Sequence, residues 1–301
     1  YEMLRSLVGS EMCIRDSSRT PFIFLAISST SNIAMDILFV KAFNMGIAGV
    51  AWATFLCQSI SCILSIIIVL KRLHSLKCNE DERVRIFDIH IFGRIAAIAV
   101  PSILQQSFIS IGNIIIQSVI NGFGTSVMAG YSAAIKLNNL VITSLTTLGN
   151  GISNYTAQNL GAGKKERIRP CFFAGGKLVW IICIPFIILY WVAGRYLLLL
   201  FMEQSSTSAI ETGMQFLKII SPFYMIVSIK LVADGVLRGA GKMGRFMITT
   251  FTDLILRVAL AILLSAHYGT AGIWSAWPIG WCISTTLSVV FFFTGEWNKK
   301  R

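Results

Sequence analysis

The residues best suited to chemistry are Asn32 and Asp36, at i, i+4 spacing inside a long apolar stretch, and Thr54 in the apolar stretch that follows. The two stretches read PFIFLAISSTSNIAMDILFVKAF and, after an NMG turn, IAGVAWATFLCQSISCILSIIIVL. Side chains four apart on a helix lie on one face, so Asn32 and Asp36 can share a ligand. Carboxylate, amide and hydroxyl oxygens together suit a proton or a small cation.

The two stretches must be helices that position these groups. Each has the length of about 20 residues that a helix needs to cross about 30 Å of hydrocarbon. Asp36 precedes the end of the first helix at Phe43 by the same number of residues as Thr54 follows the start of the second at Ile47. The pair therefore predicts a transmembrane hairpin with both side chains at one level, roughly 10 Å below its outer end.

A carboxylate at that depth costs a few kcal/mol and should face the bundle interior or a watery cavity. Two interpretations are open for the three residues. They form either a polar knot that holds helices together or a site for a coupling ion.

Composition and charge give the class of protein. Hydrophobic residues make up 55% of the chain and charged residues 13%, against about 25% charged in an ordinary soluble domain. The formal net charge of +12 could suggest nucleic acid, but short cytoplasmic loops of membrane proteins also collect Lys and Arg.

The distribution of the Lys and Arg residues along the chain decides between a nucleic-acid-binding protein and a membrane protein. One side of the predicted topology carries Arg19, Lys71, Arg72, Lys77, Arg83, Arg85, Arg94, Lys164, Lys165, Arg167, Arg169, Arg238, Lys242, Arg245, Lys299, Lys300 and Arg301, and the other carries Lys41 and Arg195. We therefore expect an all-α, multi-pass protein of the cell inner (plasma) membrane with both ends cytoplasmic, in contact with membrane lipids and not with nucleic acid.

Six further apolar segments follow the hairpin, at about 95–120, 125–156, 171–194, 209–235, 246–266 and 271–293. Eight transmembrane helices are thus expected. Residues 1–17 match none of this pattern, and their EMCIRDS string resembles translated adapter sequence, so we expect a non-native leader. The predicted parts are the leader 1–17, the last two helices of an N-terminal lobe in 18–70, a cytoplasmic inter-lobe linker in 71–94, a C-terminal six-helix lobe in 95–296 and a basic cytoplasmic tail in 297–301.

A long-range repeat supports two lobes. Gly46-Ile-Ala-Gly49 opens the second helix of the hairpin, and Gly269-Thr-Ala-Gly272 opens the last helix of the chain. Both sit in short outer turns of the same orientation, as in a parallel repeat. The period predicts twelve helices in two pseudosymmetric six-helix lobes, of which this chain, an expected fragment, carries eight.

The same offset carries Asn32, Asp36 and Thr54 onto Ile255, Ala259 and Trp277. The polar trio thus has no copy in the second lobe. A coupling site made of these residues is expected in the first lobe alone.

Other polar residues lie within the second lobe. Pro101, Gln105, Gln106 and Asn113 predict a kinked helix with three amides, which either lines a substrate cavity or makes ordinary interhelical hydrogen bonds. The candidate substrate-cavity residues are Gln105, Gln106, Asn113, Lys136 and Asn138.

Intramembrane charges at helical spacing predict two ion pairs. Lys230 with Asp234 is expected to form a snorkelling pair near the cytoplasmic end, and Asp253 with Arg257 is expected to be mutually neutralised. Lys136 has no evident local partner.

Motifs of enzyme chemistry are missing from the sequence. It contains no HExxH, no CxxC among its seven cysteines and no Gly-x-Ser-x-Gly. We expect neither an enzyme, nor a metal site, nor a cofactor other than a coupling ion, H⁺ or Na⁺.

The stretches SNIAMDILFVKAFNMGIAGVAWAT, VPSILQQSFISIGNIIIQSVINGFG, SNYTAQNLGAGKKERI and DGVLRGAGK together carry a resemblance to the MATE (multidrug and toxic compound extrusion) transporters, from their fifth helix to their twelfth. The resemblance implies two lobes that rock between inward and outward states. It also implies export of small amphipathic, often cationic compounds in exchange for H⁺ or Na⁺, by a monomer when complete.

By the same resemblance, which is to the DinF-like or MepA-like branch, Asn32, Asp36 and Thr54 correspond to the first-lobe cation or proton site of DinF-like and archaeal members. NorM-branch members carry a glutamate where this chain has Gln105 and Gln106, and an aspartate nearest Val227. A second-lobe sodium site is therefore not expected. Two alternatives stay open: a flippase for lipid-linked sugars, favoured by Lys136, Lys218 and Arg257, and a structural fragment that transports nothing alone.

Overall fold

The computed structural model describes residues 19–75, 88–202 and 207–295, and every regular element in them is helical. The all-helical prediction is therefore confirmed. The predicted leader 1–17 and tail 297–301 lie outside the described residues, as does half of the predicted linker, residues 76–87. The chain divides into two compact units, Tyr1–Ile86 and Phe87–Arg301, each of which is described by itself.

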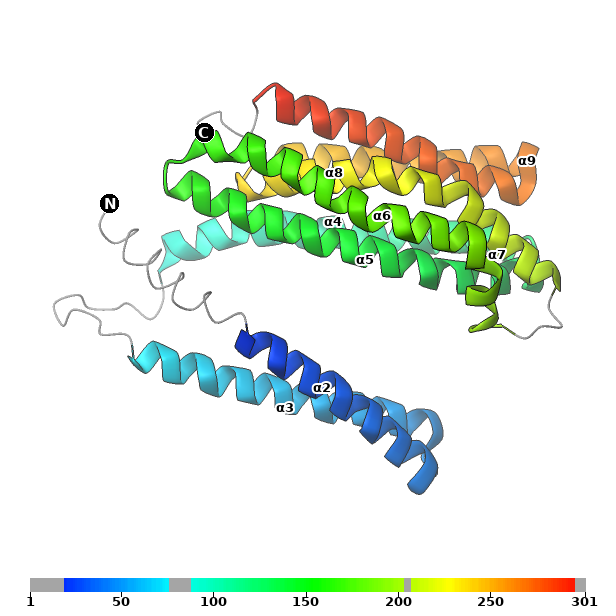
Figure 1. The fold of residues 1–301 in the computed structure, drawn as a ribbon, viewed down its shortest axis with the longest axis horizontal. Helices are drawn as coiled ribbons and strands as arrows, with labels where there is room; N and C mark the ends of the chain where they lie inside the picture. Colours follow the sequence, from blue (N-terminus) through cyan, green and yellow to red (C-terminus); the bar gives the residue numbers. More distant parts are fainter. Residues whose placement is uncertain (1–18, 76–87, 203–206, 296–301) are drawn as a thin grey trace. The chain divides into compact units, whose positions relative to one another are not determined.

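The first unit is a helical hairpin (Figure 1). It comprises α2 (Arg19–Ile37), the π-helical turn η1 (Leu38–Ala42) and α3 (Gly46–Ser75). The amide of Met45 donates to the carbonyl of Phe39 (3.1 Å), which closes the turn between the helices. Gly46 has φ 56°, a left-handed conformation that a side chain disfavours.

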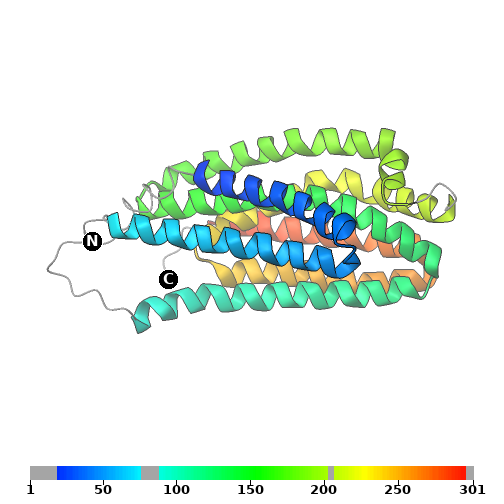
Figure 2. The same cartoon turned by 90° about the horizontal axis from the view of Figure 1, so that it is seen from below.

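The second unit is a bundle of long helices. They are α4 (Ile89–Asn121), α5 (Thr125–Gly161), η2 (Lys165–Arg167), α6 (Ile168–Leu199), α7 (Thr207–Ile220), η3 (Ser221–Phe223), α8 (Tyr224–Gly239) and α9 (Met243–Phe293). They run side by side in both views (Figure 1, Figure 2). α5 packs against α7 and α8, α8 packs against α6 and α9, and α4 packs against α9.

One predicted segment is interrupted in the structure, whereas the two predicted segments 246–266 and 271–293 correspond to the two halves of α9. The segment 209–235 is interrupted by η3, where Pro222 lacks the N–H that a continuous α-helix would use. α9 contains two helices, because Gly269 has the non-helical angles φ 58° and ψ −137°. At Gly272 a β-carbon would collide with the backbone of Leu264, so the two halves of α9 fold back closely on each other.

Gly269 and Gly46 thus share a positive φ at the start of the two predicted repeat turns.

Five helical stretches of the described residues are long and apolar enough to cross a membrane. They are Gly46–Ile68, Ile95–Asn121, Lys165–Leu199, Thr207–Gly239 and Met243–Phe293. The last, with 51 residues, is long enough for two crossings.

Glycine allows α5 and α8 to approach closely. A β-carbon at Gly235 would lie 2.6 Å from the carbonyl oxygen of Gly149, and one at Gly239 would collide with the backbone of Ser153. Small residues at a helix interface allow such backbone approach in membrane proteins. The interface fixes the position of α8, which carries the charges described next.

Candidate functional site

The hairpin brings two of its three predicted site residues together. Asn32 Nδ2 donates to Thr54 Oγ1 at 3.4 Å, which links α2 to α3. Oδ1 of Asp36, one turn further along α2, is buried and has no hydrogen-bond partner in the described part of the chain. All three side chains are half-buried. The unit thus holds an unsatisfied carboxylate oxygen on the helix face that also carries an amide.

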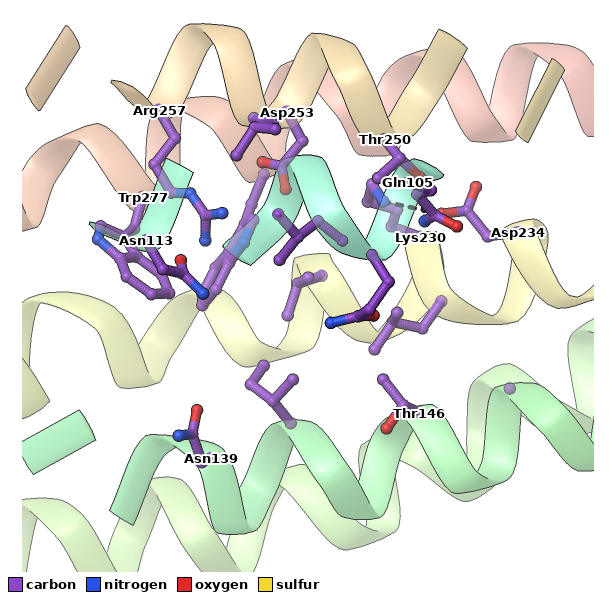
Figure 3. Close-up of a pocket in the computed structure, with 18 of the residues that line it drawn as sticks. Gln105, Asn113, Asn139, Thr146, Lys230, Asp234, Thr250, Asp253, Arg257 and Trp277 are labelled. Carbon is purple, nitrogen blue, oxygen red and sulfur yellow. Dashed lines mark hydrogen bonds and ion pairs between the residues drawn. The ribbon is translucent and has the colours of Figure 1, made fainter. Parts of the chain in front are cut away.

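The second unit contains a cavity of about 690 Å³, a size in the range of pockets for drug-sized molecules. α4, α5, α8 and both halves of α9 line it, and Figure 3 shows side chains from these helices converging on it. Its charged lining residues are Lys230, Asp234, Arg238, Asp253 and Arg257.

In one ionic cluster of this lining both carboxylate oxygens of the aspartate have partners. We call Lys230, Asp234, Thr249 and Ser288 the Asp234 cluster. Lys230 Nζ lies 2.8 Å from Asp234 Oδ2, which confirms the predicted pair. Asp234 Oδ1 accepts hydrogen bonds from Thr249 Oγ1 (3.0 Å) and Ser288 Oγ (2.7 Å). Because Lys230 and Asp234 are 5% and 3% exposed, the pair is buried in the bundle and does not snorkel as predicted.

Neutral polar side chains brace the walls around it. Gln105 Nε2 donates to Thr250 Oγ1 at 3.1 Å, from α4 to α9. Asn138 is 1% exposed, and its Oδ1 accepts from the hydroxyl of Tyr224 at 3.0 Å, which joins α5 to α8. Buried polar groups with partners hold the helices in one arrangement.

Two further charged lining residues, Asp253 and Arg257, lie on α9, and we call Asp253, Arg257 and Trp277 the α9 cluster. Asp253 Oδ1 and Arg257 Nε are buried without a hydrogen-bond partner among the described residues. Asp253 and Arg257 therefore do not form a direct ion pair within the described residues. The guanidinium of Arg257 lies over the ring of Trp277 instead, 4.5 Å from its centroid. This geometry is a cation–π contact between the two halves of α9.

Of the predicted cavity residues, Gln105, Gln106, Asn113 and Asn138 line the cavity, and Lys136 does not. The ammonium of Lys136 lies 5.2 Å from the centroid of Phe201. Of the three basic residues that favoured a flippase, Arg257 alone is among the lining residues.

Sequence reasoning did not select Tyr131, Trp277 and Trp281, which also line the cavity. The signal for Trp277 was present, because the repeat offset places it at the position of Thr54. Across residues 19–75, 88–202 and 207–295, no group of three or more His, Cys, Asp and Glu is placed to hold a metal ion.

Comparison with known families identifies the chain. The family model described as MatE matches residues 101–263, more than half of the chain and nearly all of the cavity lining. The chain belongs to the MatE family. It is thus a multi-pass membrane protein of a transporter family, as the sequence resemblance implied.

Two curated MATE relatives come from Bacillus subtilis (strain 168). The probable multidrug resistance protein YpnP is 28% identical over 94% of this chain and 63% of its own length. The probable multidrug resistance protein YoeA is 25% identical over 94% of this chain and 62% of its own length. The chain therefore spans less than two thirds of the length of these relatives.

Solved structures show the same fold. The outward-facing conformation of a multidrug resistance MATE family transporter of the MOP superfamily superposes with a TM-score of 0.81 at 18% identity. The superposition covers 92% of this chain and 63% of that one. The helical arrangement is therefore that of a MATE transporter.

Proposed function

We propose that this chain forms part of a secondary active exporter, which exchanges H⁺ or Na⁺ for small amphipathic compounds. The carrying observation is the buried Oδ1 of Asp36, which has no hydrogen-bond partner among the described residues and lies near the Asn32–Thr54 hydrogen bond in a hairpin of a MATE protein. A buried carboxylate without a partner is costly unless it is protonated or coordinates a cation. Asp36 is therefore the group proposed to take up the coupling ion.

The neighbouring groups suit that role. Asn32 uses its Nδ2 for Thr54, so its carbonyl oxygen can turn to a cation held by Asp36. Binding moves the transporter only if the ion has different affinities for the inward and outward states. We propose that neutralising Asp36 lowers the cost of burying it and so favours one of these states.

The second unit is proposed to bind the transported compound. Its cavity of about 690 Å³ offers amides, charges and the aromatic rings of Tyr131, Trp277 and Trp281. A mixed polar and aromatic lining fits small amphipathic molecules. The basic loops support a plasma-membrane protein with both ends cytoplasmic, and we propose that it works as a monomer.

Replacing Asp36 by Asn in the full-length protein tests this proposal. The variant should insert normally and lose efflux driven by an imposed H⁺ or Na⁺ gradient, because Asn can neither release a proton nor supply a charge. Uptake of ethidium into inverted vesicles measures the activity.

Thr30→Ala is the matched control, since Thr30 is exposed on the same helix and bonds only back to the carbonyl of Ala26 among the described residues. It should transport normally. Gradient-driven transport that survives in Asp36→Asn would remove Asp36 from the coupling site.

A further inference from the structure

Two opposite charges in the cavity lack the partners that its other charges have. Lys230 and Asp234 are paired, and Arg238 Nη2 donates to Asn150 Oδ1 at 2.7 Å. Asp253 and Arg257 form no hydrogen bond or ion pair within the described residues. Both line the cavity, and in Figure 3 both side chains extend toward it.

The surroundings prevent the bundle from satisfying them. Arg257 is 7% exposed, and the ring of Trp277 holds its guanidinium. Asp253 lies against Gly280, where a β-carbon would be 2.9 Å from Oδ1, so no residue with a side-chain donor fits at that position without a shift. The buried Oδ1 and Nε are closed to the cavity, so a ligand in the cavity would pair with the other carboxylate oxygen of Asp253 and the terminal guanidinium nitrogens of Arg257.

The charges that face this pair are those of the Asp234 cluster, which is neutral as a whole, and Arg238, which is bound to an amide. A purely cationic ligand at Asp253 would meet the like charge of Arg257 one helical turn away. A purely anionic ligand at Arg257 would meet Asp253 in the same way. A ligand with both charges satisfies both side chains.

We propose that Asp253 and Arg257 form a subsite for zwitterionic aromatic compounds, with the anionic group on Arg257 and the positive charge at Asp253. Trp277, Trp281 and Tyr131 supply the aromatic surface beside it. The proposal rests on the proposed export function, whose substrate class it narrows. It concerns binding in the second unit and not ion coupling in the hairpin.

Two dyes that differ in one group test the subsite. Tetramethylrhodamine with a free carboxylate is a zwitterion, and its methyl ester is a cation with the same ring system. Fluorescence polarisation measures the affinity of each for the full-length protein in lipid nanodiscs, without an ion gradient. The free acid should bind about tenfold more tightly than the ester, because hydrogen bonds to a charged group are worth at least that factor.

Three variants then locate the effect. Arg257→Gln should abolish the preference for the acid over the ester. Asp253→Asn should lower the affinity for the cationic ester, because it removes an attractive charge, and should raise the acid-to-ester affinity ratio, because it also removes the repulsion between Asp253 and the carboxylate of the acid. Arg245→Gln is the control, because Arg245 is an exposed arginine of the same helix that lies over the ring of Phe291. It should leave both affinities unchanged.

The two substitutions in the subsite thus move the acid-to-ester ratio in opposite directions. Equal affinities in the wild-type protein, or a ratio unmoved by either variant, would overturn the subsite. If Arg257→Gln does not fold, the ratio in Asp253→Asn still decides. Asp36→Asn should keep the wild-type ratio even where gradient-driven transport fails, so the two proposals fail separately.

Discussion

The Asp234 cluster and the α9 cluster lie at the same cavity, and each has an acidic and a basic residue at i, i+4 spacing. Only in the Asp234 cluster do these two residues form an ion pair within the described residues. Lys230 and Asp234 form a 2.8 Å ion pair, whereas Asp253 and Arg257, also at i, i+4, form none in the part of the chain that the structure describes. The difference comes from other helices. Thr249 and Ser288 hold the carboxylate of Asp234 in place, and Trp277 draws Arg257 away from Asp253. Helical spacing permits an ion pair, and the tertiary neighbours decide whether it forms.

The largest expected effect separates the clusters by stability. Asp234→Ala removes the 2.8 Å ion-pair partner of the buried Lys230, so the free energy of unfolding should fall by about 3–5 kcal/mol. Thermal and denaturant unfolding in detergent measure this change. Asp253→Ala removes no hydrogen bond or ion pair found in the described residues and should cost less than about 1 kcal/mol. Equal losses would mean that both clusters are structural.

A smaller effect tests the hydrogen bonds that close the Asp234 cluster. Ser288→Ala removes a 2.7 Å donor to Asp234, and a hydrogen bond to a charged group is worth about 1.5–3 kcal/mol. Ser284→Ala is the control, because this serine is equally buried on the same helix but, among the described residues, bonds only back to the carbonyl of Trp281. If both variants unfold alike in denaturant, Ser288 does not stabilise the carboxylate.

The smallest expected effect concerns the stability of the α9 cluster. Arg257→Met replaces a buried, unpaired charge by an apolar chain of similar length, so the lost cation–π contact is offset by removed desolvation. The free energy of unfolding should change by less than about 1 kcal/mol, measured by the same denaturant titration. A loss above about 2 kcal/mol would show that Arg257 stabilises the bundle.

The sequence was most informative about features that depend on local pattern. Its apolar stretches predicted the hairpin, and the positions of Asn32 and Thr54 agree with the hydrogen bond between them. The two glycine turns were recognisable because Gly46 and Gly269 need a positive φ. Pro222 offered a signal for the break between α7 and α8 that the predicted segment 209–235 did not use.

What the sequence could not supply depends on distant neighbours. The contact of Arg257 with Trp277 forms only because the chain folds back at Gly269. Helical spacing in the sequence does not show that Trp277 and Asp253 compete for Arg257. Lys136 likewise turns to Phe201, far along the chain, and not to the cavity. The cavity residues with amide side chains were easier to select, because amides are conspicuous in an apolar helix.

The reversal at Gly269 has an optical consequence. Arg257 precedes this turn and Trp277 follows it, so their contact bridges the two halves of α9. Any tilt of the last helix about the turn changes the distance between a cation and an indole, and indole emission responds to a nearby charge. Trp277, one of the seven tryptophans of the chain, is therefore placed so that its own emission depends on its distance from Arg257.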